Sequence, residues 1–219
     1  FEPTGLYQFS TAYSASGLPG YAQGVKFTRE SNTSFFGLSI QDEAFDVDSD
    51  DNNLSSSSYA IEAAYAQDLG NGFAVFIGGA FEDADAGDTY IVNAYTTYET
   101  GAWLFAAEVN FGNSENGAFD ITDAYDIIAA DVTGNDVDVM SGLVMANYAY
   151  SDDSSVTARL SYEEVEGTTD ADITKYTLAH NKALADNLAL IVELSYADAD
   201  INDIDIDGSQ LAVELLFTF

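Results

Sequence analysis

Apolar and polar residues alternate with a period of two along most of the chain. In the segment 102–112, for example, Trp103, Phe105 and Val109 fall on one face, and Glu108 and Asn110 fall on the other. This alternation predicts strands that have one apolar and one polar face. Twelve strands are expected, at 5–14, 20–30, 33–42, 57–67, 73–82, 89–99, 102–112, 138–150, 155–163, 174–182, 188–197 and 209–219.

The expected connections alternate between short and long. Tight turns are predicted at Glu30–Asn32, Asp68–Gly72, Glu99–Gly101, Ser151–Ser154 and Ala183–Asn187. Longer segments are predicted at 15–19, 43–56, 83–88, 113–137, 164–173 and 198–208. Transmembrane β-barrels combine short periplasmic turns with longer extracellular loops, whereas the Greek-key connections of a sandwich would break this order. We therefore predict a single all-β domain over residues 1–219, a transmembrane antiparallel up-and-down β-barrel of about twelve strands.

Charge follows the same division. The 219 residues include 38 Asp and Glu against 5 Lys and Arg, a formal net charge of −33. The acids gather in the longer segments, as at 46–51 and 198–207, which predicts acidic extracellular loops. Such a charge excludes nucleic acid as a partner, because few side chains could neutralise phosphates. The absence of cysteine excludes disulfides and thiolate metal sites.

The two ends of the sequence carry different signals. The last expected strand alternates Leu211, Val213, Leu215 and Phe217 on one face and stops on an aromatic residue, Phe219. At the other end, the first residues lack the basic start and apolar core of a signal peptide. Two alternatives follow: a leader has been removed, or the sequence starts inside a longer protein with further N-terminal strands.

Several phrases resemble a known family. They are 145–153 (MANYAYSDD), 156–163 (VTARLSYE) and 185–194 (ADNLALIVEL), together with the terminal aromatic strand. These phrases resemble Gram-negative outer-membrane porins of the family type called putative β-barrel porin. The strand that closes on Phe219 resembles the β-signal read by the barrel-assembly machinery. The resemblance implies a bacterial outer-membrane location, contact with lipid and lipopolysaccharide, passive diffusion of small solutes and no enzymatic activity. It also allows a homotrimer.

A polar set is expected to project into the lumen. It consists of Glu62, Asn93, Glu108, Asn110, Asn147, Arg159, Glu163, Lys175, Glu193 and Glu214. Small residues at other lumenal positions, such as Ala106 and Ala189, favour an open path, and the excess of carboxylates favours cations. The alternative is a structural or interaction barrel, in which Lys26, Arg159 and Lys175 bridge the carboxylates and plug the lumen. A strand count of about twelve leaves both open, because eight-stranded barrels are filled and much larger ones hold a channel.

Two further patterns could carry chemistry. Asp203, Asp205 and Asp207 have the spacing of an EF-hand Ca²⁺ loop, with Glu214 in the last position. Strands rather than helices are expected on both sides, so we interpret the segment as a turn. Crowded carboxylates on this rim would still bind Ca²⁺ or Mg²⁺ loosely. His180 is expected near a periplasmic turn on the lipid side; without a serine motif, it is interpreted as interfacial rather than catalytic.

The longest expected connection, 113–137, mixes acidic residues with an apolar stripe. Loops of this length in compact domains are often functional. It either folds back over the barrel mouth and constricts it, or forms a short amphipathic cap against neighbouring loops.

Overall fold

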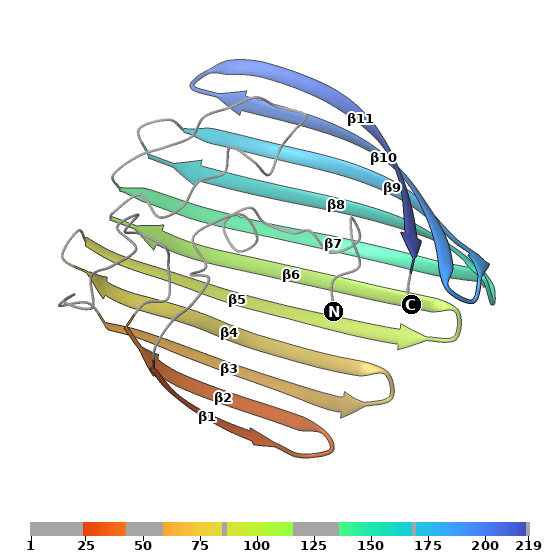
Figure 1. Cartoon of the computed structure of the whole chain (residues 1–219). Coiled ribbons are helices and arrows are strands. Elements are labelled where there is room, and N and C mark those ends of the chain that lie inside the picture. The colour runs from red at the N-terminus through yellow and green to blue at the C-terminus, as the bar shows by residue number, and fades with distance from the viewer. Residues whose placement is uncertain (1–23, 43–58, 85–86, 116–135, 168–169, 218–219) are drawn as a thin grey trace.

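A computed structural model describes residues 24–42, 59–84, 87–115, 136–167 and 170–217. These residues form one sheet of eleven strands in sequential order, in which every strand is antiparallel to the next (Figure 1). The strands are β1 (Gly24–Glu30), β2 (Ser34–Gln41), β3 (Tyr59–Gly70), β4 (Phe73–Ala84), β5 (Gly87–Thr100), β6 (Trp103–Ser114), β7 (Val137–Ser151), β8 (Ser154–Glu166), β9 (Ala171–Ala185), β10 (Leu188–Ile201) and β11 (Ile204–Phe217). Among these residues, no helix is long and apolar enough to cross a membrane.

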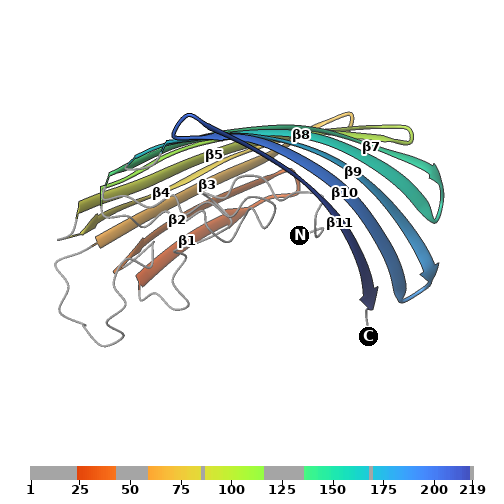
Figure 2. The same ribbon diagram turned by 90° about the horizontal axis from the view of Figure 1, so that it is seen from above.

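The all-β, antiparallel up-and-down fold is confirmed. Each strand from β1 to β11 overlaps one of the expected strands, and the remaining one, at 5–14, lies outside the described residues. The sheet curves into an arch (Figure 2). Within the part of the chain that the structure describes, β1 and β11 are the two edges and do not pair with each other.

The acidic segment 198–208 is not the long connection that was predicted. β10 continues to Ile201 and β11 begins at Ile204, and the turn between them is Asn202 and Asp203, both with positive φ (50° and 64°). Asn and Asp tolerate this left-handed conformation, which tight hairpin turns require. Ala and Ile alternate with Asp on both strands, and on β10 the apolar positions Ala197, Ala199 and Ile201 are buried. This burial outweighs the low strand propensity of Asp.

Two other connections are also shorter than predicted. β4 extends to Ala84 and β5 begins at Gly87, while β8 extends to Glu166 and β9 begins at Ala171. Long connections remain between β2 and β3 and between β6 and β7, and the expected segment 15–19 lies outside the described residues. Within the three segments that were predicted as long connections but are short, most of the acidic residues that the structure describes therefore lie on strands rather than in the turns.

The two faces of the sheet differ in exposure. On β10, Leu194 and Tyr196 are 53% and 42% exposed, whereas Ser195 between them is 1% exposed. The cross-strand register carries this alternation through the neighbouring strands, because Ser195 pairs with Thr177 and Leu194 with Leu178. Side chains crowd together on the concave side of an arched sheet and spread apart on its convex side, so we assign the buried face to the inner, concave side and the exposed face to the outer, convex side. Figure 2 shows this curvature.

Aromatic residues form two rows on the outer face. One row lies toward the acidic end of the strands and the other lies beside the tight turns. Phe73 and Phe81 on β4, like Tyr90 and Tyr98 on β5, stand eight residues apart in the sequence. Rings within each row contact one another across strands, as in the pairs Tyr59–Phe81 (6.4 Å between centroids) and Phe73–Tyr98 (6.1 Å).

Beyond the aromatic row near the acidic end, the outer face becomes acidic and the inner face becomes apolar. The outer positions there are acidic: Asp138, Glu164, Asp172, Asp198, Asp200, Asp205 and Asp207. The inner positions are apolar and buried, among them Val137, Val139, Val165, Ile173, Ala199 and Ile201. An apolar outer face suits hydrocarbon and an acidic one suits water, so the strands continue past the apolar band into an aqueous region.

Candidate functional site: the inner face of the sheet

All ten side chains predicted to face the lumen occupy inner positions of the sheet. The register places them there strand by strand; Asn93 pairs with Asn110, Asn110 with Ser141, and Ser141 with Glu163. The complete set is Glu62, Asn93, Glu108, Asn110, Asn147, Arg159, Glu163, Lys175, Glu193 and Glu214. Their shared face is an observation, and their role as a pore lining remains a prediction.

Four of the inner residues on β5, β6 and β7 form one buried network. The Asn93 amide donates to Glu108 Oε1 at 2.5 Å and to Asn110 Oδ1 at 2.6 Å. The Asn110 amide in turn donates to Ser141 Oγ at 3.2 Å and lies 3.4 Å from Glu108 Oε1. Glu108 is only 6% exposed. Buried polar groups are stable when they are satisfied in this way, so the amides fix the Glu108 carboxylate against the wall.

A second chain of contacts crosses β8, β9 and β10. Arg159 Nη2 donates to Thr177 Oγ1 at 3.3 Å, and Thr177 Oγ1 lies 3.4 Å from Ser195 Oγ. Ser195 Oγ donates to Glu193 Oε1 at 3.1 Å. Two hydroxyls thus separate the guanidinium from this carboxylate. The other oxygen, Glu193 Oε2, is buried and accepts no hydrogen bond.

The sequence identified the charged and amide members of these networks but missed their hydroxyl partners, Ser141, Thr177 and Ser195. Each of the three lies an even number of positions from a predicted inner residue on the same strand. Because alternate residues of a strand share a face, the sequence could have predicted that they face inward. Other inner residues have simpler contacts. Ser39 Oγ donates to Glu62 Oε2 at 3.1 Å, and the Asn147 amide donates to Thr157 Oγ1 at 2.7 Å.

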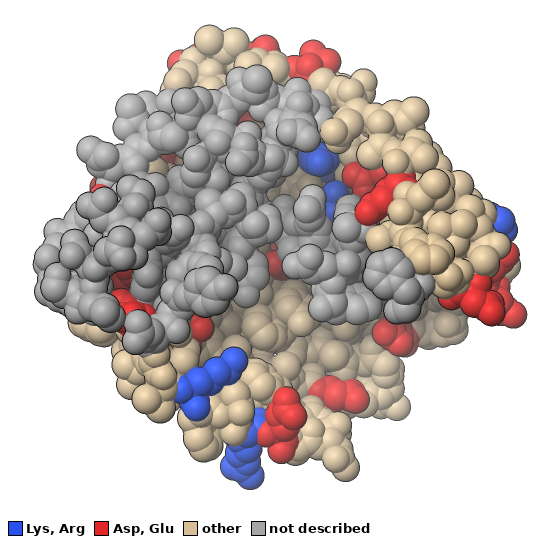
Figure 3. All heavy atoms as spheres, in the orientation of Figure 1, with Lys and Arg blue, Asp and Glu red and all other residues tan. Residues whose placement is uncertain are grey.

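Exposure of the inner face changes along the strands. Toward the acidic end, the inner side chains of Val137, Val165 and Ile173 are almost completely buried. Toward the tight turns, Tyr95 is 42% exposed, and Asn147 and Glu193 are half-buried. Figure 3 looks onto this concave side and shows acidic atoms at many places around its margin and few basic ones. The described inner face is therefore more accessible near the tight turns.

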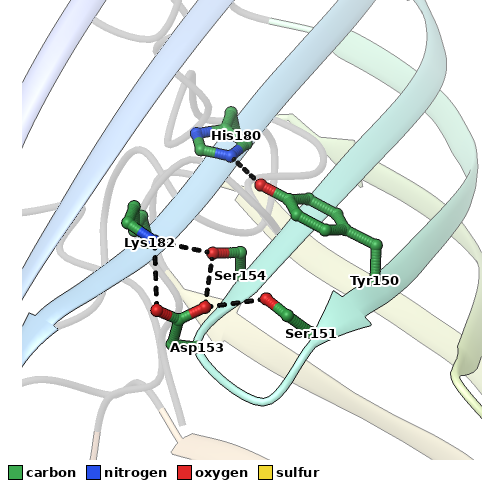
Figure 4. A network of polar contacts seen from close by, with 6 residues as sticks. All are labelled: Tyr150, Ser151, Asp153, Ser154, His180 and Lys182. Carbon is green, nitrogen blue, oxygen red and sulfur yellow. Dashed lines mark hydrogen bonds and ion pairs between the residues drawn. The ribbon is translucent and has the colours of Figure 1, made fainter.

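A separate polar cluster links the tight turn between β7 and β8 to strand β9 (Figure 4). Lys182 Nζ on β9 lies 3.0 Å from Asp153 Oδ2 in the β7–β8 turn, and Ser151 and Ser154 donate to Asp153 Oδ1 at 2.7 and 2.8 Å. The two serine hydroxyls and then Lys182 hold the pKa of the Asp153 carboxyl well below its usual range.

His180 lies beside this cluster on the outer face. Its Nε2 is 2.6 Å from the Tyr150 hydroxyl, and the two rings stack at 6.0 Å. Its position beside the tight turns agrees with the interfacial interpretation. The cluster as a whole lies at the level of the second aromatic row, apart from the inner face.

The predicted cation ligands do not form an EF-hand loop. Asp203 lies in the two-residue turn, and Asp205 and Asp207 are exposed on the outer face of β11, a continuous strand from Ile204 to Phe217. Across the described ranges, no group of three or more His, Asp and Glu side chains is arranged to hold a metal ion. Loose binding of Ca²⁺ or Mg²⁺ stays a prediction. So does the constriction or capping role of 113–137, since residues 116–135 lie outside the described residues.

An antiparallel up-and-down sheet with an apolar outer band between two aromatic rows and a polar inner face is the wall of a transmembrane β-barrel. Comparison of the sequence with protein families agrees. The chain belongs to the family described as "Putative beta-barrel porin-2, OmpL-like", whose sequence model matches residues 3–219. The outer-membrane location and the assignment to porins rather than enzymes are thereby confirmed. No curated protein matches the chain.

Solved structures show the same fold at low sequence identity. The outer-membrane channel DcaP of Acinetobacter baumannii aligns with a TM-score of 0.66 at 10% identity, covering 90% of this chain and 62% of that one. OmpT of Vibrio cholerae with loop L8 deleted gives 0.62 at 14% identity, with coverages of 91% and 70%. A porin refined at 1.8 Å resolution gives 0.56 at 18% identity, with coverages of 89% and 62%. The chain thus spans about three-fifths of the length of two of these three structures.

Proposed function

We propose that the protein forms a water-filled diffusion channel for small solutes in the outer membrane, with a preference for cations. The observation that carries this proposal is the composition of the inner face. Its carboxylates, on Glu62, Glu82, Glu108, Glu163, Glu193 and Glu214, outnumber its bases, on Lys26, Arg159 and Lys175. A path lined by one excess sign of charge raises the local concentration of the opposite ion.

Small residues on the same face support an open path. Ala64 on β3 pairs with Gly78 on β4, and Glu193 pairs with Ala179 and Ala212 on its two sides. Side chains of this size leave room between the polar groups, whereas large ones would fill the interior as they do in narrow barrels.

The decisive test is planar-bilayer conductance of the purified protein, with the reversal potential measured under a KCl gradient. We expect steady channels whose reversal potential is shifted from zero toward the equilibrium potential of K⁺. Steady channels without selectivity would refute the cation preference, and a lack of channels from folded, heat-modifiable protein would refute the channel.

A second candidate function is a structural or interaction barrel with a plugged lumen. One observation favours it: the inner face near the acidic end is almost completely buried, including Glu163 (1% exposed) and the apolar residues around it. The conductance experiment separates the two functions. Folded protein that never conducts would support the plugged barrel. In that case the acidic end would be the surface that binds cations or an external partner.

We also propose that the acidic end binds Ca²⁺ or Mg²⁺ loosely and through these ions contacts lipopolysaccharide. Carboxylates that face each other on neighbouring strands repel, and divalent ions relieve that repulsion. Urea unfolding in CaCl₂ and in NaCl of equal ionic strength tests this. Equal stabilisation by both salts would leave only screening and would refute binding.

Two partner proposals rest on the resemblance of the strand pattern to porins. Assembly by the barrel-assembly machinery predicts that removal of Phe219 lowers the yield of folded protein in cells but leaves refolding in detergent unchanged. Assembly into a homotrimer predicts three times the chain mass by light scattering in detergent. A normal cellular yield or a monomeric mass, respectively, would refute them.

A further inference from the structure

The lumenal carboxylates are not equivalent, and we infer that Glu193, supported by Glu214, determines the cation selectivity of the channel. The inference rests on the proposed function, because it names the residues responsible for the proposed cation preference. It is based on the hydrogen bonds, the neighbours and the exposure of three inner-face glutamates, Glu193, Glu214 and Glu108.

Glu193 accepts fewer hydrogen bonds than Glu108 does. Its Oε1 accepts one hydrogen bond, from Ser195, while its Oε2 accepts none. The ion pair between Lys182 and Asp153 lies elsewhere, on the outer face. A chain of hydrogen bonds through the hydroxyls of Thr177 and Ser195 connects the guanidinium of Arg159 to Glu193, and Ser195 orients the carboxylate.

Glu214 adds a second charge next to Glu193. In the β10–β11 register, Glu193 pairs with Ala212, and Glu214 pairs with Ile191, so the two glutamates are diagonal neighbours on one face. Diagonal positions in an antiparallel pair are within reach of long side chains. Directly beside Glu193 in the register stand two small residues, Ala179 on β9 and Ala212 on β11.

Glu108 provides the contrast. Two amides, from Asn93 and Asn110, donate to its Oε1, and the residue is almost fully buried. A carboxylate held by two amides and covered by protein is less accessible to ions in the lumen than a half-buried one. Glu193 is half-buried and lies toward the tight turns, where the inner face is accessible.

The test compares reversal potentials of single channels under a KCl gradient for the wild type, Glu193→Gln, Glu214→Gln, Glu108→Gln and the control Asp186→Asn. Asp186 lies in the turn between β9 and β10, outside the inner face, and its substitution removes the same charge. Glutamine preserves the shape of glutamate, and heat-modifiability on gels verifies that each variant is folded.

Removing the Glu193 charge is expected to lower the ratio of K⁺ to Cl⁻ permeability by about twofold or more. Glu214→Gln should lower it less, Glu108→Gln least, and Asp186→Asn not at all. A selective wild type whose ratio is unchanged in Glu193→Gln, or falls most in Glu108→Gln, would overturn the inference while leaving the proposed function intact. A non-selective or non-conducting wild type would overturn both.

Discussion

Asn93 is the residue on which the buried network of the inner face depends. Its amide donates to both Glu108 and Asn110, so a single side chain satisfies two acceptors on the next strand. All three residues are buried, and water does not readily replace a lost donor there. The network therefore fixes the positions of β5 and β6 relative to each other at the level of the apolar outer band.

Replacement of Asn93 by alanine should destabilise the protein by about 1–3 kcal/mol, because it removes the amide donor to the buried Asn110 Oδ1 and the shorter of the two hydrogen bonds to Glu108 Oε1. Urea unfolding in lipid vesicles, followed by tryptophan fluorescence of Trp103, measures the change. Asn147→Ala is the matched control: Asn147 donates to Ser155 and Thr157 but is half-buried, so water can replace its bonds. Equal losses in both variants would contradict the role assigned to burial.

At the scale of strands, the acidic ends of β8 to β11 set carboxylates directly opposite one another. Glu164 pairs with Asp172, Asp172 with Asp200, and Asp200 with Asp205. Like charges in facing positions destabilise a sheet. The buried apolar residues on the other face of the same strands, such as Ile173 and Ala199, oppose this repulsion and hold the strand ends together.

Replacement of Asp200 by asparagine should therefore raise the free energy of unfolding, by about 0.2–1 kcal/mol, because two facing repulsions disappear. The gain should shrink at high NaCl, since salt screens exposed charges. Urea unfolding at low and high ionic strength measures both effects. Asp186→Asn, at the opposite end of β10, should show no comparable gain; a loss of stability in Asp200→Asn would contradict the argument.

The strands could be predicted from the sequence, but their lengths at the acidic end could not. The alternation that places Glu193 and Asn110 on one face is a property of each strand alone, so it is visible in the sequence. The run from Ala197 to Asp207 alternates equally well, but its aspartates are typical of turns, and only packing on the inner face decides between the two. Partners such as Ser141 and Thr177 depend on register between strands, which parity alone does not specify.

At the scale of the whole sheet, the described strands form an arch whose two edge strands run in the same direction. Eleven strands, each antiparallel to the next, leave β1 and β11 parallel to one another. An antiparallel barrel therefore closes around these strands only with an odd number of further ones. The strand predicted at 5–14, which lies outside the described residues, would satisfy this requirement.

The distance between the two aromatic rows sets the membrane thickness that the protein matches best. The eight residues between the rows correspond to about 26 Å of strand, at roughly 3.3 Å per residue. With the strands tilted by about 40°, the apolar band is about 20 Å tall, slightly less than the usual height of about 25 Å. When the hydrocarbon core of the bilayer is thicker than the apolar band, each ångström of the difference in thickness costs free energy.

Folding should consequently be more complete in vesicles of phosphatidylcholine with dodecanoyl chains than with octadecenoyl chains. Heat-modifiability on gels measures the folded fraction. Trp103→Ala, which removes a ring stacked on Phe105 in the row beside the tight turns, should weaken the dependence on chain length. Equal folding in both lipids would contradict the estimate. If the dependence holds, the spacing of a few rings favours residence of this chain in thin membranes over thicker ones.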